Sequence, residues 1–341
     1  MQPPPAAQVT TRGSRVRRYL PLLGLLLFAW VISRQNLPAL GAALAAVRPG
    51  ALLQAAGLFG LNMLLKSVRW HRMLQAQRLP LPLPVAMAAF LASQFYGQVT
   101  LGRVGELYKA EALTERGVPL GTALSSSLYD RLLDLAAVLL VAAVLATTVL
   151  GDARAGAVAG ACMALLMIGG LVVLRARSLA AFGPVVRLRA WLEARRGTRG
   201  ALGLLVALIS GLGPLLRPLF LIEAVAWTAV SWSLYFASVW RVAAGMGIDA
   251  SPVTLTAASA LGALSALLPV TISGLGAREV IFMQVLGPIG VAPERAVVLS
   301  LLHLGMMTAV ATSVGLLGLI ARQRQRLRLG EHPEPGQPPA R

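Results

Sequence analysis

A short charged stretch, residues 97–111, lies between two long apolar runs. It carries Arg103, Glu106 and Lys109 together with the glycines Gly102 and Gly105. At membrane depth such charges are costly to bury, and glycines weaken a continuous helix. Irregular backbone at that depth is tolerated only where protein or a water-filled cavity surrounds it. The stretch therefore predicts a broken segment that is held inside a bundle of helices.

A second stretch, residues 269–279, repeats this pattern later in the chain. Both stretches contain Val-Thr and then a glycine-rich break, which here consists of Gly274 and Gly276. An arginine and a glutamate follow, here Arg278 and Glu279. Two broken segments in corresponding halves of a chain are typical of transporters built from inverted repeats. The pattern therefore favours a scaffold that holds both segments near the bilayer interior.

The composition agrees with this interpretation. Of the 341 residues, 57% are hydrophobic and 13% are charged. A soluble domain carries about 25% charged residues. The deficit of charge and the long apolar runs predict an all-α polytopic membrane protein. The net charge of +18 comes from basic residues clustered between the runs. That distribution is typical of cytoplasmic loops beside anionic lipid, so no nucleic-acid partner is predicted.

Full membrane spans are predicted at eight places: residues 19–33, 51–65, 125–150, 155–174, 201–216, 219–240, 252–268 and 294–320. Residues 19–33 also fit the core of a signal peptide, although the later apolar runs favour a first span. The spans form a single transmembrane domain, residues 19–321, between basic termini that are predicted to be disordered, residues 1–18 and 322–341.

Two further segments are predicted to be re-entrant. Residues 278–290 are too short to cross, because a span needs about 20 apolar residues. Residues 175–199 hold seven arginines against one acid. Together with the basic termini, they predict that both ends of the chain lie in the cytoplasm of a bacterial-type inner membrane. This orientation holds if residues 85–101 enter and leave on the cytoplasmic side and residues 278–290 on the outer side.

The first charged stretch has two interpretations. Glu106 lies three residues from both Arg103 and Lys109, so on a helix it can bridge the two cations. The plain interpretation is an interfacial loop whose charges are solvated. The functional one is that Gly102 and Gly105 let the backbone approach an anionic headgroup, whose phosphate binds Arg103.

The span that follows begins with three charges, Asp130, Arg131 and Asp134. Arg131 can reach Asp134 three residues on. As a structural cluster, the two acids could pair with Arg103 or Lys109. As functional groups, they could gate a path for lipid or protons, because ionisable residues inside a membrane are functional candidates.

Arg278 is the second candidate for binding an anion, together with Gly274, Gly276 and Glu279. An arginine at a broken segment needs a cavity or an anion as its partner. His303, in the last span, is predicted to be a packed polar residue. The basic and aromatic cluster at residues 66–72 is predicted to be an interface anchor at the end of the second span.

Catalysis finds little support in the sequence. No Ser, His and acid arrangement and no Walker loop is visible. The single cysteine, Cys162, lies in an apolar run, and the three histidines are far apart. No catalytic residue, metal site or cofactor is therefore predicted.

Three motifs, taken in order, resemble the membrane region of the lysylphosphatidylglycerol synthase family. They are Gly102-Arg103-Val104-Gly105-Glu106, Tyr129-Asp130-Arg131 with Asp134, and residues 269–279 with Arg278 and Glu279. In two-part members of that family, a membrane flippase module moves aminoacylated phosphatidylglycerol outward, and a separate cytosolic domain makes that lipid. This sequence holds no such synthase domain, so the resemblance implies lipid handling and not aminoacyl transfer.

Two functions are carried forward from the sequence. The favoured one is a lipid flippase or transporter for an anionic phospholipid or glycolipid, or a polyprenyl or hopanoid-type lipid. The alternative is a membrane subunit or enzyme of lipid or glycolipid synthesis. The partners expected are membrane lipids, with a homo-oligomer or a lipid-synthesis enzyme left open.

Overall fold

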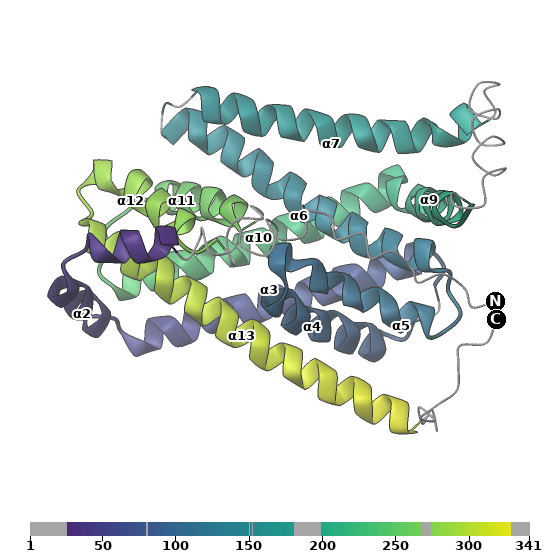
Figure 1. Cartoon of the computed structure of the whole chain (residues 1–341), viewed down its shortest axis with the longest axis horizontal. Coiled ribbons are helices and arrows are strands. Elements are labelled where there is room, and N and C mark those ends of the chain that lie inside the picture. The colour runs from purple at the N-terminus through teal and green to yellow at the C-terminus, as the bar shows by residue number, and fades with distance from the viewer. Residues whose placement is uncertain are drawn as a thin grey trace, which may run out of the picture.

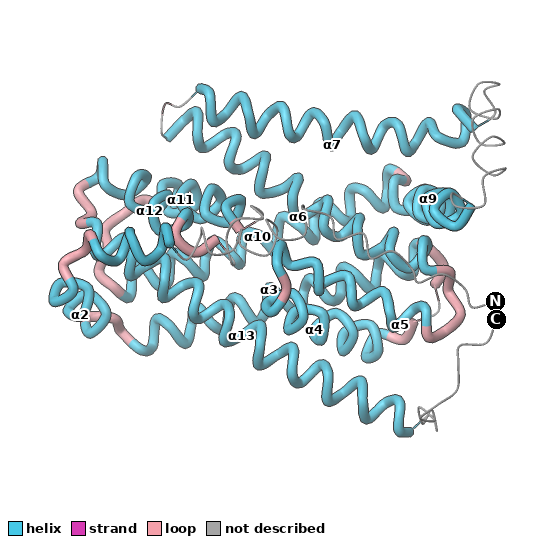
Figure 2. Tube along the Cα trace, viewed as in Figure 1, coloured by secondary structure: helices cyan, strands magenta, loops and turns pink. Residues whose placement is uncertain are grey.

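The computed structural model describes residues 26–79, 81–149, 151, 153–180, 199–266 and 274–328. It is helical almost throughout these residues, with short loops between the helices (Figures 1 and 2). The predicted all-α polytopic membrane architecture is confirmed. The predicted terminal segment 1–18 and most of 322–341 lie outside the described residues. The same holds for most of the arginine-rich segment 175–199 and for residues 267–273.

The first half of the chain begins with a helical segment at residues 26–33. It continues through α2 (Leu37–Ala45), α3 (Pro49–Ala76), α4 (Leu83–Val99), the 3₁₀ helix η1 (Leu101–Ala110), α5 (Glu111–Thr114) and α6 (Leu120–Val149). The second half consists of α7 (Ala153–Ala180), α9 (Arg199–Leu212), η2 (Gly213–Leu216), α10 (Pro218–Gly245), α11 (Pro252–Ser265), α12 (Ala277–Leu286), η3 (Gly287–Ile289) and α13 (Pro293–Arg328).

Proline sets the start of several long helices. Pro49, Pro218, Pro252 and Pro293 are the first residues of α3, α10, α11 and α13. At that position the missing N–H costs nothing, because the first turn has no internal acceptor for it, and the fixed φ suits a helix. The predicted corner between residues 214 and 218 is confirmed, since Arg217 is extended between η2 and α10.

Within the described residues, four helices are long and apolar enough to cross a membrane. They are Pro49–Ala76, Leu120–Thr148, Pro218–Gly245 and Pro293–Gln325. The helices α9 and α11 have 14 residues each, fewer than the about 20 that a straight crossing needs. Many large apolar side chains on the long helices are exposed, among them Leu53 and Ile222. Apolar side chains of this kind suit the hydrocarbon of a bilayer.

The two halves pack against each other reciprocally. The helix α4 of the first half packs along α13 of the second, and α11 of the second packs along α6 of the first. In the same way α2 packs against α13 and α9 packs against α6, while α3 and α10 pack against each other. Such an exchange of equivalent partners is the packing expected of two structural repeats.

The central pair, α3 and α10, is antiparallel. At one end, the N–H of Arg48 donates to the carbonyl oxygen of Gly245 at 3.1 Å. At the other end, Arg72 Nε donates to Glu223 Oε1 at 2.6 Å. The beginning of each helix therefore meets the end of the other, so the two halves run in opposite directions, as in an inverted repeat.

Each half contains a helical hairpin with a break. In the first half η1 folds back onto α4, and in the second half α12 folds back onto α11. Figure 1 shows α4 and α5 in one half of the molecule along its long axis, and α11 and α12 in the other half. The predicted broken segment 97–111 contains η1, which forms the first hairpin with α4, and residues 278–290 are a short helix followed by a 3₁₀ turn. Residues 269–273 of the second stretch lie outside the described residues. The full span predicted at residues 252–268 is wrong, because α11 has 14 residues and pairs with α12 in the second hairpin.

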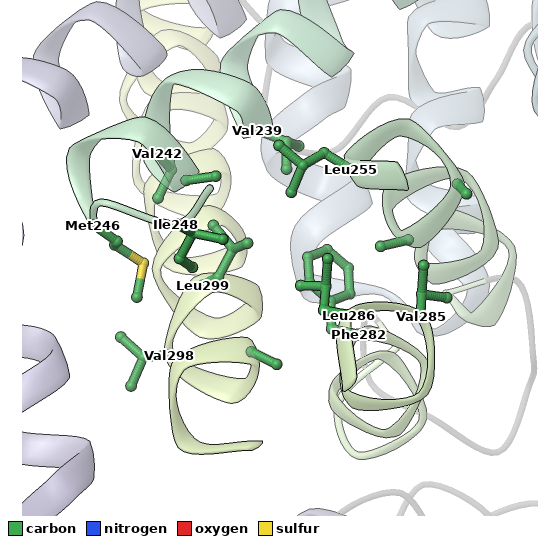
Figure 3. Close-up of a cluster of buried hydrophobic side chains, with 14 of the residues drawn as sticks. Val239, Val242, Met246, Ile248, Leu255, Phe282, Val285, Leu286, Val298 and Leu299 are labelled. Atoms are coloured by element: carbon green, nitrogen blue, oxygen red, sulfur yellow. The ribbon is translucent and has the colours of Figure 1, made fainter. Parts of the chain in front are cut away.

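Apolar side chains of α10, α11, α12 and α13 form the core around the second hairpin. Val242 of α10 lies near Leu299 of α13, and Val239 of α10 lies beside Leu255 of α11, while Phe282 of α12 belongs to the same cluster (Figure 3). This cluster holds α12 against the bundle and so fixes the position of its first residues.

Small residues bring α4 and α13 into close contact. A Cβ atom added to Gly318 would lie 2.6 Å from the backbone nitrogen of Ala92 and 2.8 Å from the carbonyl oxygen of Ala88. The same helix contains Gly305, where an added Cβ would meet nothing within 4 Å. The two glycines therefore provide a matched test of this contact.

We expect Gly318→Ala to destabilise the purified protein by about 1–3 kcal/mol, the cost of overpacking a tight contact. Gly305→Ala is expected to leave stability unchanged or to raise it, because alanine favours the helix. Thermal unfolding in detergent measures both. Equal melting temperatures for the two variants would contradict the close packing of α4 on α13.

Candidate functional site

A buried arginine, Arg69, links three helices in the first half. Its side chain is fully buried on α3. It donates to Asp130 Oδ1 from Nη2 at 2.6 Å and to Asp134 Oδ1 from Nη1 at 2.9 Å, both on α6. The same Nη1 donates to Thr228 Oγ1 on α10 at 2.8 Å. Because removing one partner would leave a buried charge uncompensated, these bonds fix α3, α6 and α10 together.

The first hairpin supplies a second cation to the same acid. Lys109 of η1 is fully buried and donates from Nζ to Asp130 Oδ2. Its ammonium group also lies 4.7 Å from the ring centre of Phe90 and 5.5 Å from that of Trp70. Both oxygens of Asp130 are thus bound by cations, one from α3 and one from the hairpin.

Asp134, one turn further along α6, lies nearer the surface of the bundle. It accepts from Lys66 Nζ at 2.8 Å and from Trp232 Nε1 at 3.3 Å. The side chains of Lys66 and Asp134 are 14% and 21% exposed, whereas those of Arg69 and Lys109 are at most 1% exposed. The cluster therefore has a closed interior and an accessible edge.

Arg131 and Glu106 complete this edge. Arg131 Nη2 lies 3.1 Å from Glu106 Oε1, and the Arg131 side chain is 24% exposed. We refer to these seven residues as the first charged cluster: Lys66, Arg69, Glu106, Lys109, Asp130, Arg131 and Asp134. Four are basic and three are acidic, so its formal charge is +1. A surplus positive charge in an apolar bundle favours an anionic ligand.

The second hairpin carries a buried arginine without a carboxylate. Arg278 of α12 is 2% exposed, and its Nη2 lies 2.6 Å from Nδ1 of His303 on α13. The other ring nitrogen of His303 lies 2.9 Å from Ser238 Oγ on α10. In the part of the chain that the structure describes, Arg278 has no ion pair, and its Nε has no hydrogen-bond partner. We call Arg278, His303 and Ser238 the second unit.

Glu279 has a structural role beside this unit. Its Oε2 accepts from the backbone N–H of Gly276 at 2.6 Å, and its Oε1 accepts from Ser300 Oγ at 2.8 Å. These bonds cap α12 and fix it to α13. Gly274 and Gly276 have φ angles of +86° and +85°, in the left-handed region that favours glycine. Glu279 and the two glycines therefore shape the hairpin and place Arg278.

The structure shows which charged side chains of the first cluster form ion pairs. Glu106 Oε1 pairs with Arg131. Its predicted bridge between Arg103 and Lys109 stays a prediction, because the side chain of Arg103 lies outside the described residues. Asp134 binds Lys66 and Arg69. The expected pairing of Asp130 with Lys109 is confirmed.

Gly105 of the first stretch has a packing role that the sequence did not indicate. A Cβ atom on Gly105 would collide with the backbone carbonyl of Tyr96, so this glycine lets η1 pack on α4. The backbone of Gly102 lies at the start of η1, while the side chain of Arg103 falls outside the described residues. The predicted anion contact of Arg103 stays a prediction.

Sequence reasoning missed Lys66 and Arg69 as site residues. They were grouped with Arg72 as an anchor at the membrane surface. Helical spacing is the signal that separates these two residues from Arg72. Lys66 and Arg69 are three residues apart, and Met73 is four residues beyond Arg69, so all three share one face of the helix. Met73 is fully buried, whereas Arg72 lies on the exposed side of α3. Thr228 and Trp232 gave no signal of their own.

The matched pair Arg69 and Arg72 tests the cluster. We expect Arg69→Met to lower the free energy of unfolding by about 3–5 kcal/mol, because Asp130 and Asp134 would lose a buried cation. Arg72→Met removes only a half-exposed pair with Glu223, with an expected cost of about 0–1 kcal/mol. Reversible unfolding in mixed micelles gives both values. Similar losses for the two variants would show that the Arg69 network is not a buried one.

Comparison with known proteins adds a family match. The family model described as lysylphosphatidylglycerol synthase TM region matches residues 21–315. The match covers both hairpins, the first charged cluster and the second unit. No curated protein and no solved structure matches the chain significantly.

Proposed function

We propose a lipid-transporting function for this chain, which belongs to the lysylphosphatidylglycerol synthase TM region family. It is a multi-pass membrane protein, and its family is a membrane domain of lipid-related proteins. The finer proposal is that it moves a lipid with an anionic headgroup between the two leaflets. The single observation that carries this proposal is the burial of a cation, Lys109 or Arg278, on each of two hairpins in an apolar bundle.

The first charged cluster supports an anion site at its accessible edge. Lys66 and Arg131 are partly exposed there, while Arg69 and Lys109 hold Asp130 beneath them. An entering phosphate would compete with Asp134 and Glu106 for these two outer cations. When the headgroup leaves, Asp134 and Glu106 pair with these cations again, so each outer cation has an anionic partner in both states.

The inverted arrangement of the halves supports movement across the membrane. In transporters of this architecture, one half rocks against the other around a central binding site. The hairpins are the parts of each half that carry charge into the bundle. We propose that the headgroup follows these charges while its acyl chains stay in the surrounding lipid. The proposal includes no catalytic step.

Translocation in proteoliposomes tests this function. Purified protein is reconstituted with a trace of fluorescent phosphatidylglycerol, and an impermeant quencher reports the fraction in the outer leaflet. A fluorescent phosphatidylcholine gives the matched zwitterionic lipid. We expect the wild type to move phosphatidylglycerol faster than phosphatidylcholine, because only the first carries a net negative charge.

Two variants locate the path in the same assay. Lys66→Gln and Arg278→Gln are expected to slow movement of phosphatidylglycerol by about tenfold, since a charged hydrogen bond contributes about 1.5–3 kcal/mol. Arg72→Gln, whose pair with Glu223 lies on the exposed side of α3, is the control. Folded wild-type protein that moves neither lipid would contradict the proposal and favour a subunit role in lipid synthesis, which predicts a partner co-purifying in fixed ratio.

A further inference from the structure

The second unit occupies the position in its half that the Arg69–Asp130–Lys109 triad occupies in the first. Arg69 and Ser238 each lie 20 residues after the first residue of their helices, α3 and α10. Asp130 and His303 each lie 10 residues after the first residue of α6 and α13. We call Asp130 and His303 the central residues of their halves. Each is bound by a cation from its hairpin, Asp130 by Lys109 and His303 by Arg278.

The central residue differs between the halves, and this difference has a chemical consequence. Asp130 is a carboxylate that neutralises one of its two cations. His303 is an imidazole, which can accept a hydrogen bond from Arg278 but brings no negative charge as a neutral ring. The positive charge of Arg278 therefore has no counter-charge within the second unit.

The hydrogen bonds of the second unit fix the tautomer of His303. Ser238 Oγ donates its proton to the carbonyl oxygen of Tyr235 at 2.6 Å, so it must accept from the ring nitrogen Nε2. Arginine only donates, so Nδ1 must accept from Arg278 with its lone pair. His303 is thus neutral, with its single ring proton on Nε2.

A second proton cannot bind His303 while Arg278 stays in place. A proton on Nδ1 would set two donors against each other across the 2.6 Å contact. An anion that draws the guanidinium away frees the lone pair of Nδ1, and the unpartnered Nε of Arg278 gives such an anion a buried donor. Binding of an anion and protonation of His303 are therefore linked.

Few other groups face His303. Arg278 faces it from α12, and the ring of Tyr235 on α10 lies 5.4 Å from it. Glu279 is turned to Ser300 and Gly276. In the described parts of α2, α3 and α4, which also pack against α13, no charged group contacts the imidazole. Arg278 is thus the charged group that controls protonation.

We propose that the second unit is a site for a phosphate-ester headgroup, and that binding there transfers one proton from water to Nδ1 of His303. This inference rests on the proposed lipid transport and names its coupling ion. With a phosphodiester monoanion and the proton bound, the unit carries the same net charge of +1 as it does empty. A proton gradient would then bias the direction in which the lipid moves.

Isothermal titration measures the linked proton directly. Dihexanoyl phosphatidylglycerol is titrated into the detergent-solubilised protein in two buffers of different ionisation enthalpy at equal pH. The dependence of the binding heat on buffer gives the number of protons taken up, and we expect about one per lipid. His303→Gln keeps an acceptor for Arg278 but cannot be protonated, so its binding heat is expected not to depend on the buffer. His71→Gln, which changes a histidine on α3 whose ring contacts Gln75 at an exposed position, should match the wild type.

The outcomes separate the coupling from the transport function. Binding by the wild type with no dependence on buffer would overturn proton coupling and leave lipid binding intact. Absence of binding would overturn both. Inorganic phosphate is a second titrant, and proton uptake with phosphate but not with the lipid would overturn a lipid headgroup as the ligand.

Nitrogen NMR gives a second readout that keeps His303 and so does not depend on the folding of the His303→Gln variant. The chain has three histidines, so a His71→Gln/His332→Gln protein leaves His303 as the one labelled imidazole. We expect a neutral ring protonated on Nε2 in the free protein, and an imidazolium once dihexanoyl phosphatidylglycerol is bound. A ring that stays neutral with lipid bound would overturn the proposal.

Discussion

The ion-paired contact of Arg69 and Lys109 with Asp130 is the interaction on which the first half of the structure depends. All three side chains are buried in a bundle of apolar helices. A single charge at this position would be very costly, and the pairing makes it tolerable only while α3, α6 and η1 keep their positions. The first hairpin is therefore held by electrostatics as well as by packing, and any ligand that competes for these cations also acts on the hairpin.

The second half reaches the same geometry with different chemistry. Its hairpin is held by the apolar cluster around Phe282 and by the cap that Glu279 provides, while Arg278 lies against a neutral imidazole. Because the two halves run in opposite directions, equivalent positions are reached from opposite ends of the bundle. Arg69 and Lys109 share a carboxylate partner, whereas Arg278 lies against an imidazole, so the two halves should differ in affinity for an anion and in response to pH.

The sequence was sufficient to predict the class of fold and both broken segments, because apolar runs and glycine-rich breaks are local signals. The pairing of Asp130 with Lys109 could also be anticipated. The position of Arg69 could not, since a basic residue near a span end is usually at the membrane surface. Its burial depends on α10 closing over α3, a contact between residues more than a hundred positions apart. The pairing of Arg131 with Glu106 likewise depends on how η1 folds back, which no spacing rule describes.

The side of the membrane that each hairpin faces tests the central claim most directly. Single cysteines are placed at Pro119, after the first hairpin, and at Ala292, after the second, in a Cys162→Ser background; both native side chains are exposed. An impermeant thiol reagent is then applied to intact cells and to inverted membrane vesicles. Labelling of the two positions from opposite sides is the result that an inverted pair of hairpins predicts. Labelling of both from the same side would contradict it.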